Sequence, residues 1–205
     1  MKIGFLYAGQ GTQKEQMGKA LYETYPTAKA MYDSIHLDDI DVKDLCFNGD
    51  LATLSQTSNT QPCMVATAAV ITELLKEEGI IPDFVAGLSL GEYSALYAAG
   101  VFDFQTALEL VRFRGLAMEQ AVQGMDSMMS AILGMDRETL TAICEEASSE
   151  GLVQIANYNC PGQLVIGGET KAVEKAATMA LEQGAKRAVT LNVSGPFHTK
   201  LLKPA

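Results

Sequence analysis

Apolar residues follow two different periods along the chain, and the alternation between them predicts the fold. Short apolar runs at 2–8 and 84–86 are typical of buried strands. Helical spacing of apolar residues recurs in four longer stretches: 16–35, 60–78, 92–99 and 103–120. A polar, acidic segment at 38–58 shows neither period, so we expect irregular structure there. Strands that alternate with helices predict a parallel α/β sheet.

Two of these helices carry start signals. Thr60 is the expected N-cap of the helix at 60–78, with Pro62 in the first turn, where its missing N–H costs little. Asp103 is the expected N-cap of the helix at 103–120.

The pattern after residue 127 changes to a second arrangement of short elements. It predicts strands and helices in the order β-α-β-β-α-β, at 131–134, 137–149, 153–158, 163–167, 171–183 and 186–193. This order is the split βαβ arrangement of a ferredoxin-like subdomain. We therefore predict an α/β core made of 1–127 and 194–205, with a ferredoxin-like α+β subdomain at 128–193 inserted into it.

Composition and charge narrow the class of protein. The 205 residues are 48% hydrophobic and carry a formal net charge of −10, and a field of that sign repels nucleic acid. No stretch approaches the roughly 18 consecutive apolar residues of a membrane span, and the N-terminus lacks the pattern of a signal peptide. We expect a cytoplasmic protein that binds neither nucleic acid nor membrane, while the oligomeric state is not predictable from these features.

Cysteine and histidine usage argues against a metal site. The four cysteines are far apart and form no C-x-x-C pair, and the chain contains only two histidines. We therefore expect no bound metal and no redox dithiol. His36 lies in acidic, polar surroundings without an accompanying motif, so we interpret it as a surface residue.

The stretch Gly87-Leu88-Ser89-Leu90-Gly91 follows the strand at 84–86 and precedes the helix at 92–99. Strand, Gly-x-Ser-x-Gly and helix together are typical of a nucleophilic serine on a sharp turn, where the glycines allow backbones to approach closely. The first N–H groups of the helix would point toward a developing oxyanion. Chance occurrence in a glycine-containing loop is the alternative. In chain order, His198 follows the serine, as the histidine does in α/β hydrolases.

Two further features remain ambiguous from the residues alone. The turn at Gly9-Gln10-Gly11 follows the first strand but lacks the third glycine of a dinucleotide loop and the Gly-Lys-Ser/Thr of a phosphate loop. Arg114 falls on the apolar stripe of its helix, so it either pairs with an internal carboxylate or lines a cleft that accepts an anion. Arg112 falls off the stripe and is predicted to pair with Glu109.

Five motifs together resemble those of malonyl-CoA:acyl carrier protein transacylases. They stand in the family's order over the whole chain: Gly9-Gln10-Gly11-Thr12-Gln13, Gly87 to Ala95, Arg114-Gly115, Asn157 to Gln163, and Gly195-Pro196-Phe197-His198. The resemblance implies a hydrolase-like α/β core with a ferredoxin-like insert. It also implies transfer of a malonyl group from malonyl-CoA to the phosphopantetheine thiol of acyl carrier protein in fatty acid synthesis, without a cofactor, because the coenzyme A thioester is itself the substrate.

The same resemblance assigns roles to individual residues. Ser89 is implied as nucleophile, His198 as general base and acid, and Arg114 as the clamp for the malonyl carboxylate. Leu90 N–H and the Gln10 region are implied as the oxyanion hole, and Asn159 as a polar residue near the site. For carrier-protein docking, the sequence suggests four cations as candidates, with ordinary solvated side chains as the alternative: Lys186, Arg187, Lys200 and Lys203.

The chain departs from the family pattern at two places. Leu88 stands before the nucleophile where the family usually has histidine, from which we expect tuning rather than loss of activity. The family continues beyond the position of Ala205 with further core elements and a glutamine that orients the histidine. We keep three alternatives to a transacylase of fatty acid synthesis: a free-standing polyketide-synthase acyltransferase, a serine hydrolase, and an inactive fragment that binds carrier protein.

Overall fold

The computed structural model describes residues 2–191 and 193–205. The chain forms two compact units, Met1–Leu116 and Ala117–Ala205. Each unit has its own sheet: the first a two-stranded parallel sheet, the second a four-stranded antiparallel sheet. This arrangement confirms the α/β class with a separate ferredoxin-like part. The second unit also contains residues that we assigned to the core, at 117–127 and 194–205, so the predicted domain boundaries remain a prediction.

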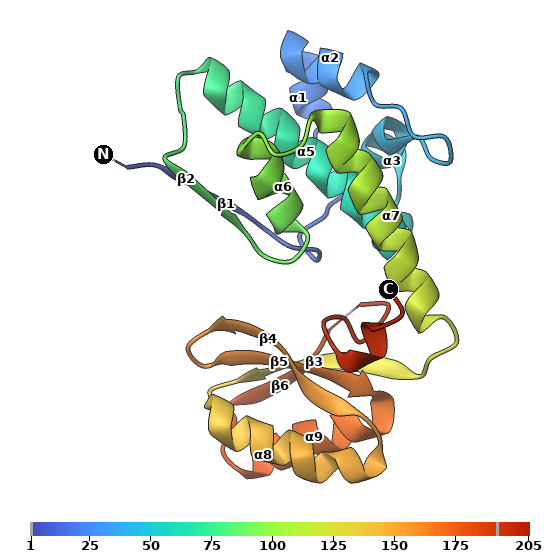
Figure 1. Cartoon of the computed structure of the whole chain (residues 1–205), viewed down its shortest axis with the longest axis vertical. Coiled ribbons are helices and arrows are strands. Elements are labelled where there is room, and N and C mark those ends of the chain that lie inside the picture. The colour runs from blue at the N-terminus through green and yellow to red at the C-terminus, as the bar shows by residue number, and fades with distance from the viewer. Residues whose placement is uncertain (1, 192) are drawn as a thin grey trace. The chain divides into compact units, whose positions relative to one another are not determined.

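The first unit is organised around two strands, β1 (Gly4–Tyr7) and β2 (Phe84–Gly87), which pair in parallel from Gly4 opposite Phe84 to Tyr7 opposite Gly87. Helix α6 (Gly91–Ala98) contacts both strands (Figure 1). The Tyr7 hydroxyl lies 2.8 Å from the Thr72 hydroxyl of the neighbouring helix. The opposite face is open, because Leu6 is 79% exposed.

The remaining helices of the first unit confirm part of the predicted pattern and correct the rest. They are α1 (Lys19–Thr24), α2 (Pro26–Asp33), α3 (Val42–Asn48), α4 (Leu51–Leu54), α5 (Thr57–Glu77) and α7 (Phe104–Val122), of which α7 continues into the second unit. The predicted helix at 16–35 is two helices, because Tyr25 is extended before Pro26. The segment 38–58, predicted to be irregular, contains α3 and α4. Asp41 and Asp50 cap them by accepting hydrogen bonds from backbone N–H groups.

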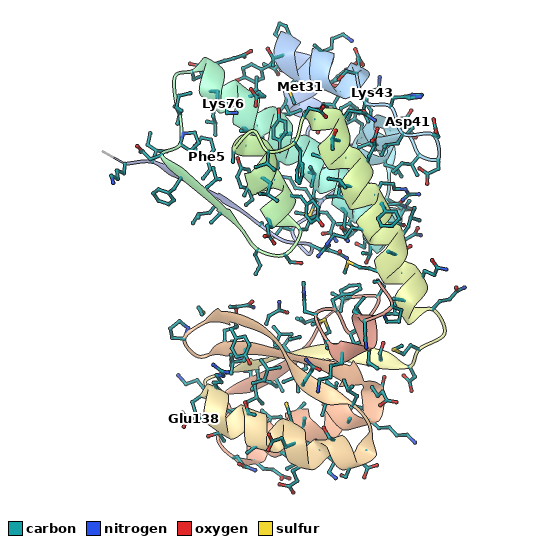
Figure 2. All side chains as sticks on the ribbon, in the orientation of Figure 1. Phe5, Met31, Asp41, Lys43, Lys76 and Glu138 are labelled. Atoms are coloured by element: carbon teal, nitrogen blue, oxygen red, sulfur yellow. The ribbon has the colours of Figure 1, made fainter. Side chains whose placement is uncertain are left out.

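Helix α5 begins at Thr57, three residues before the predicted start at Thr60, so that Thr60 is not the N-cap. Its N-terminal residues are polar yet buried: Thr57, Ser58, Asn59, Thr60 and Gln61. Farther along, apolar residues of α5 pack with α2, α3 and α7 in one core that includes Tyr32, Leu54, Val70 and Leu108. Lys76, near the other end of α5 (Figure 2), forms an ion pair with Glu73 at 3.0 Å.

The second unit has the predicted β-α-β-β-α-β order. Its elements are β3 (Ser127–Leu133), α8 (Arg137–Ala147), β4 (Val153–Cys160), β5 (Gln163–Glu169), α9 (Thr170–Glu182) and β6 (Arg187–Thr190), with single 3-10 turns at Ser148–Glu150 and Lys200–Leu202. The strands lie in the order β4-β5-β3-β6 and all neighbours are antiparallel. Helices α8 and α9 lie side by side over one face of this sheet (Figure 1).

Side chains on the strands of the second unit alternate between the two faces of the sheet, and those on one face form a core with the helices. Ile132, Leu164 and Ile166 face the helices and pack with Leu140 and Ile143 of α8. Asp136 caps α8, because its carboxylate accepts the Thr139 N–H at 2.9 Å. Asp103 caps α7 in the same way through Thr106 N–H at 2.7 Å, as predicted. Among the residues that the structure describes, no helix is both long and apolar enough to cross a membrane.

Candidate active site

The Ser89 turn has the backbone conformation expected of a nucleophile elbow. Ser89 has a φ of 53°, in the left-handed region that a non-glycine residue rarely adopts. A Cβ at Gly87 would collide with the Gly91 backbone, and one at Gly91 would collide with the Tyr7 carbonyl. The turn therefore needs glycine on both sides of the serine. Strain of this kind at an exposed turn is typical of functional sites.

Backbone groups from two segments lie at this turn. Leu90 is the N-cap of α6, so its N–H belongs to the unsatisfied first turn of that helix. The Gly9-Gln10-Gly11 turn lies against the elbow, because Leu88 N–H donates to the Tyr7 carbonyl at 3.1 Å and a Cβ at Gly9 would lie 2.9 Å from the Leu88 carbonyl oxygen. The Gln10 side chain donates to the Thr57 hydroxyl at 3.1 Å, which joins this turn to α5.

Arg114 brings a positive charge directly to the serine. One terminal guanidinium nitrogen donates to Ser89 Oγ at 3.1 Å, and the other donates to Gln61 Oε1 at 2.8 Å. Both recorded partners are uncharged. The Tyr93 ring lies 5.6 Å from Arg114 Cζ, within cation–π range. Burial lowers the pKa of the Arg114 guanidinium, while Tyr93 and Glu92 act in the opposite direction, and an arginine side chain keeps its charge in proteins.

A close contact between helices α7 and α5 places this guanidinium. A Cβ at Gly115 would lie 2.7 Å from Ser58 Cα and 3.0 Å from the Thr57 carbonyl oxygen. Glycine therefore allows α7 to approach the first turn of α5 at this point. Arg114, one residue earlier, then reaches Gln61, which is fully buried.

Arg112 on the same helix has a different environment. It binds Asp39 with two nitrogens, at 2.7 and 3.0 Å, and donates to the Ser58 carbonyl at 2.8 Å. The prediction that Arg112 pairs with Glu109 is wrong, because Glu109 instead accepts from Gln105. Asp39 comes from the segment at 38–58, which was predicted to be irregular. Arg112 is the structural arginine of this helix, and its carboxylate partner compensates its charge.

The two predicted site residues of the second unit lie at chain reversals. His198 is exposed, with a φ of 60°, between buried Phe197 and Thr199. Thr199 Oγ1 donates to the Pro196 carbonyl at 2.6 Å, which holds this loop together. Asn159 lies exposed at the end of β4, and its side chain donates to Gln163 Oε1 at 3.2 Å. Since both belong to the second unit, the pairing of His198 with Ser89 and the role of Asn159 remain predictions.

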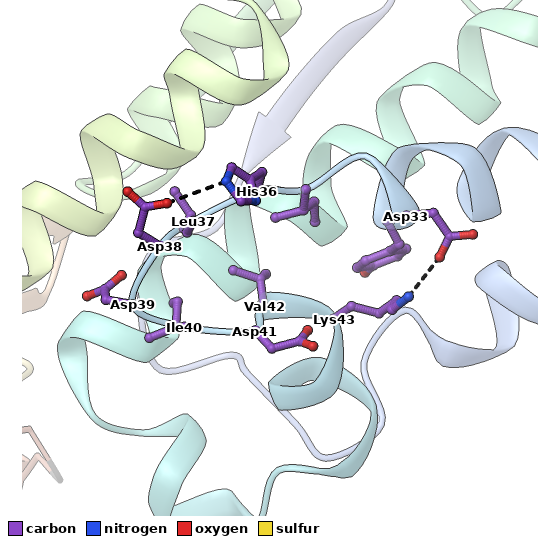
Figure 3. Close-up of a pocket in the computed structure, with 11 residues that line it drawn as sticks. Asp33, His36, Leu37, Asp38, Asp39, Ile40, Asp41, Val42 and Lys43 are labelled. Atoms are coloured by element: carbon purple, nitrogen blue, oxygen red, sulfur yellow. Dashed lines mark hydrogen bonds and ion pairs between the residues drawn. The ribbon is translucent and has the colours of Figure 1, made fainter.

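A separate pocket in the first unit lies along the loop between α2 and α3 (Figure 3). Its volume is about 440 Å³, and its lining includes His36, Asp38, Asp39 and Asp41. His36 Nε2 lies 3.4 Å from Asp38 Oδ1, and both side chains are almost fully exposed, as the surface interpretation of His36 predicted. Within 2–191 and 193–205, no group of three or more His, Cys, Asp or Glu side chains could hold a metal ion.

Sequence reasoning missed Gln61 and Tyr93 as neighbours of the site. Five consecutive polar residues at 57–61, at the start of an otherwise apolar helix, were the available signal for Gln61. The predicted helix start at Thr60 left residues 57–59 outside the helix, so these five residues were not recognised as one polar helix terminus. Tyr93 lies in the predicted helix after the elbow, where the sequence pattern assigned its aromatic ring no role.

Comparisons with known proteins place this chain in a family. The model of the acyl transferase domain matches residues 4–204. The malonyl CoA-acyl carrier protein transacylase of Bacillus subtilis strain 168 is 51% identical over 207 residues, which are 100% of this chain and 65% of that protein. The chain thus spans about 65% of the length of the curated relatives it matches.

Solved structures agree with this assignment. The malonyl CoA-acyl carrier protein transacylase of Clostridium perfringens has a TM-score of 0.93 at 41% identity, covering 100% of this chain and 65% of that one. A complex of a type II polyketide acyl-carrier protein with its malonyl transacylase gives 0.92 at 38% identity, covering 100% and 67%. The chain therefore belongs to the acyl transferase domain family.

Proposed function

We propose that the chain is part of an acyltransferase that moves a malonyl group from malonyl-CoA to the phosphopantetheine thiol of acyl carrier protein, in fatty acid synthesis. The observation that carries this proposal is the Arg114 guanidinium, 3.1 Å from Ser89 Oγ on a strained turn. A nucleophile with a cation at hydrogen-bond distance suits an acyl group that carries its own negative charge. The names of the relatives support the same substrate class.

The reaction uses Ser89 as a temporary carrier of the acyl group. His198 takes the Oγ proton as the oxygen attacks the thioester carbonyl carbon, and the carbonyl electrons move to the oxygen. Leu90 N–H and the Gln10 backbone region stabilise that oxyanion. The C–S bond then breaks, coenzyme A leaves with a proton from His198, and a malonyl ester of Ser89 remains. Attack by the carrier thiol repeats these steps in reverse and regenerates the serine.

The distance between guanidinium and hydroxyl favours a short dicarboxylic acyl chain. In a malonyl ester, the carboxylate carbon is three bonds from Oγ, which corresponds to about 4 Å at ordinary bond lengths. A guanidinium nitrogen that already lies 3.1 Å from Oγ can meet that carboxylate after a small side-chain rotation. An acetyl ester would bring no anion to this half-buried cation, so it should be rejected.

The acceptor requires a docking surface for an acidic carrier protein. The four candidate cations all lie exposed in the second unit: Lys186, Arg187, Lys200 and Lys203. Lys200→Glu should weaken transfer to carrier protein and leave acylation by malonyl-CoA unchanged. If both half-reactions change equally, Lys200 has no docking role. The proposal includes no cofactor, since the coenzyme A thioester is the substrate, and the cytoplasmic location remains a prediction from the sequence.

Mass spectrometry of the protein after incubation with malonyl-CoA tests the proposed function. We expect one malonyl group on the peptide that contains Ser89, and none in Ser89→Ala. Addition of carrier protein should discharge the ester onto the carrier thiol. A hydrolase would instead lose the ester to water at the same rate with or without carrier. Absence of any adduct on Ser89 would contradict the proposal.

A further inference from the structure

We propose that Gln61 is a positioning residue that fixes Arg114 through a neutral contact and thereby sets the preference for acyl groups that carry a carboxylate. This inference rests on the proposed function and names the residue that gives the site its selectivity. Its starting point is the contact between Gln61 Oε1 and a terminal nitrogen of Arg114, at 2.8 Å.

Burial makes this contact rigid. Gln61 is 0% exposed and lies in the first turns of α5, where glycine at residue 115 allows α7 to pack closely against that helix. A buried side-chain amide keeps its hydrogen bonds, because an unsatisfied polar atom costs free energy. The guanidinium is planar, so the nitrogen that Gln61 holds and the nitrogen that points to Ser89 Oγ can only move together.

The neutrality of Gln61 is as important as its position. A carboxylate at residue 61 would form an ion pair with Arg114 and compensate its charge, as Asp39 does for Arg112 on the same helix. An amide oxygen accepts the hydrogen bond and leaves the net positive charge in place. The site therefore holds a partly desolvated cation that makes no ion pair within the described residues, although Glu92 acts on its charge from a distance, and an acyl carboxylate would supply a direct anionic partner.

The Tyr93 ring fits the same interpretation. It lies 5.6 Å from Arg114 Cζ and stabilises the cation through its π electrons, without adding a competing negative charge. Gln61 and Tyr93 are thus uncharged groups that hold Arg114 in place. Its second terminal nitrogen remains directed toward Ser89, where the acyl ester forms.

Gln61→Glu tests this proposal, with Gln56→Glu as the matched control. Gln56 is the N-cap of the same helix and is exposed, so the control adds the same charge to the same helix terminus away from the recorded Arg114 contacts. The readout is the ratio of malonyl to acetyl groups on the Ser89 peptide after exposure to equal concentrations of the two coenzyme A thioesters. We expect Gln61→Glu to lower that ratio at least about tenfold, the scale of a lost charge-assisted hydrogen bond.

A second variant separates anchoring from charge. Gln61→Met removes the acceptor at similar volume, so Arg114 keeps its charge and loses its support. We expect malonyl acylation to fall by about tenfold, mainly through KM, while acetyl acylation stays within about twofold. Because this variant adds no buried charge, it keeps the test valid if Gln61→Glu does not fold.

The outcomes distinguish the two levels of the account. An unchanged malonyl-to-acetyl ratio in folded Gln61→Glu and Gln61→Met, while the unmodified chain still carries malonyl on Ser89, overturns the role of Gln61 alone. An equal loss in the Gln56→Glu control would also overturn it, because the effect would then be one of charge at the helix terminus. An unmodified chain without malonyl on Ser89 contradicts the proposed function, and the role of Gln61 with it.

Discussion

Arg112 and Arg114 are two residues apart on α7, yet their partners give them different roles. Arg112 makes a two-nitrogen ion pair with Asp39, which is the usual way to accommodate a partly buried guanidinium. Arg114 contacts only uncharged atoms among its recorded hydrogen-bond partners. Helical periodicity placed Arg114 on the buried stripe but could not choose between an internal partner and a ligand. Its partners come from residues 61 and 89, so that choice needed tertiary structure.

Gly115 provides a residue-scale prediction in which two effects have opposite signs. Replacing a glycine inside a helix by alanine raises helix stability by about 1 kcal/mol when the new methyl group meets no obstacle. At Gly115 the methyl group would meet Ser58 Cα at 2.7 Å, which is backbone and cannot rotate away. We therefore expect Gly115→Ala to lower the melting temperature and to weaken malonyl acylation of Ser89.

Thermal unfolding followed by circular dichroism measures the first effect. A melting temperature that rises in Gly115→Ala would mean that α7 and α5 are not in close contact at this position. Leu116→Ala is the control on the adjacent residue, since Leu116 is 42% exposed and its truncation should change the melting temperature less.

At the scale of elements, the sequence predicted the second unit better than the first. All four strands and both helices of the β-α-β-β-α-β unit were predicted in order, because each apolar run is bounded by a clear turn such as Pro161-Gly162. In the first unit, α3 and α4 were missed. They are short, and their apolar residues, such as Cys46 and Leu54, are buried by tertiary contacts rather than by a regular stripe.

Some residues of the candidate site could be predicted from the sequence and others could not. Ser89 was predictable because the elbow is a local motif whose glycines can be read from the sequence. The Gln61 contact was not, since it joins the first turns of α5 to a residue on α7 that is 53 positions away. Asp39, the partner of Arg112, lies in a segment that was expected to be irregular. The apolar pattern of the helix at 103–120 gave no indication that Arg112 would pair with this segment.

The packing of α8 on the antiparallel sheet predicts a large effect from one core residue. Leu140 of α8 is 0% exposed and packs with Ile132 and Ile166. Leu140→Ala should lower the free energy of unfolding by about 2–5 kcal/mol, the range for a buried leucine. Leu181→Ala on α9 is the matched control, because Leu181 is 48% exposed. Similar losses in the two variants, measured by denaturant titration, would contradict this account of the core.

At the scale of the whole molecule, the two sheets differ in how well their strands are covered. The parallel pair has exposed apolar residues such as Leu6 and Phe84, at 79% and 56% exposure. Strand β5 lies between two antiparallel neighbours, and its residues 164–168 are buried. Protection of backbone amides follows burial and hydrogen bonding.

Hydrogen exchange measures this difference directly in the whole chain. We expect amides of residues 4–7 and 84–87 to exchange at least about ten times faster than those of 164–167, because local opening of the two-stranded sheet exposes little additional surface. Equal protection of the two sheets would show that the parallel pair is covered in solution.

The central claim is that Ser89 takes up a malonyl group selected by Arg114. Its most direct test is peptide mass spectrometry of the chain and of Arg114→Ala, after exposure to equal concentrations of malonyl-CoA and acetyl-CoA, with Arg112→Ala as the control. We predict malonyl on Ser89 in the unmodified chain and in the control. In Arg114→Ala, the malonyl-to-acetyl ratio should fall by about 10- to 100-fold, the scale of losing hydrogen bonds to a charged group. A ratio unchanged in Arg114→Ala, or a chain without malonyl on Ser89, would contradict the account.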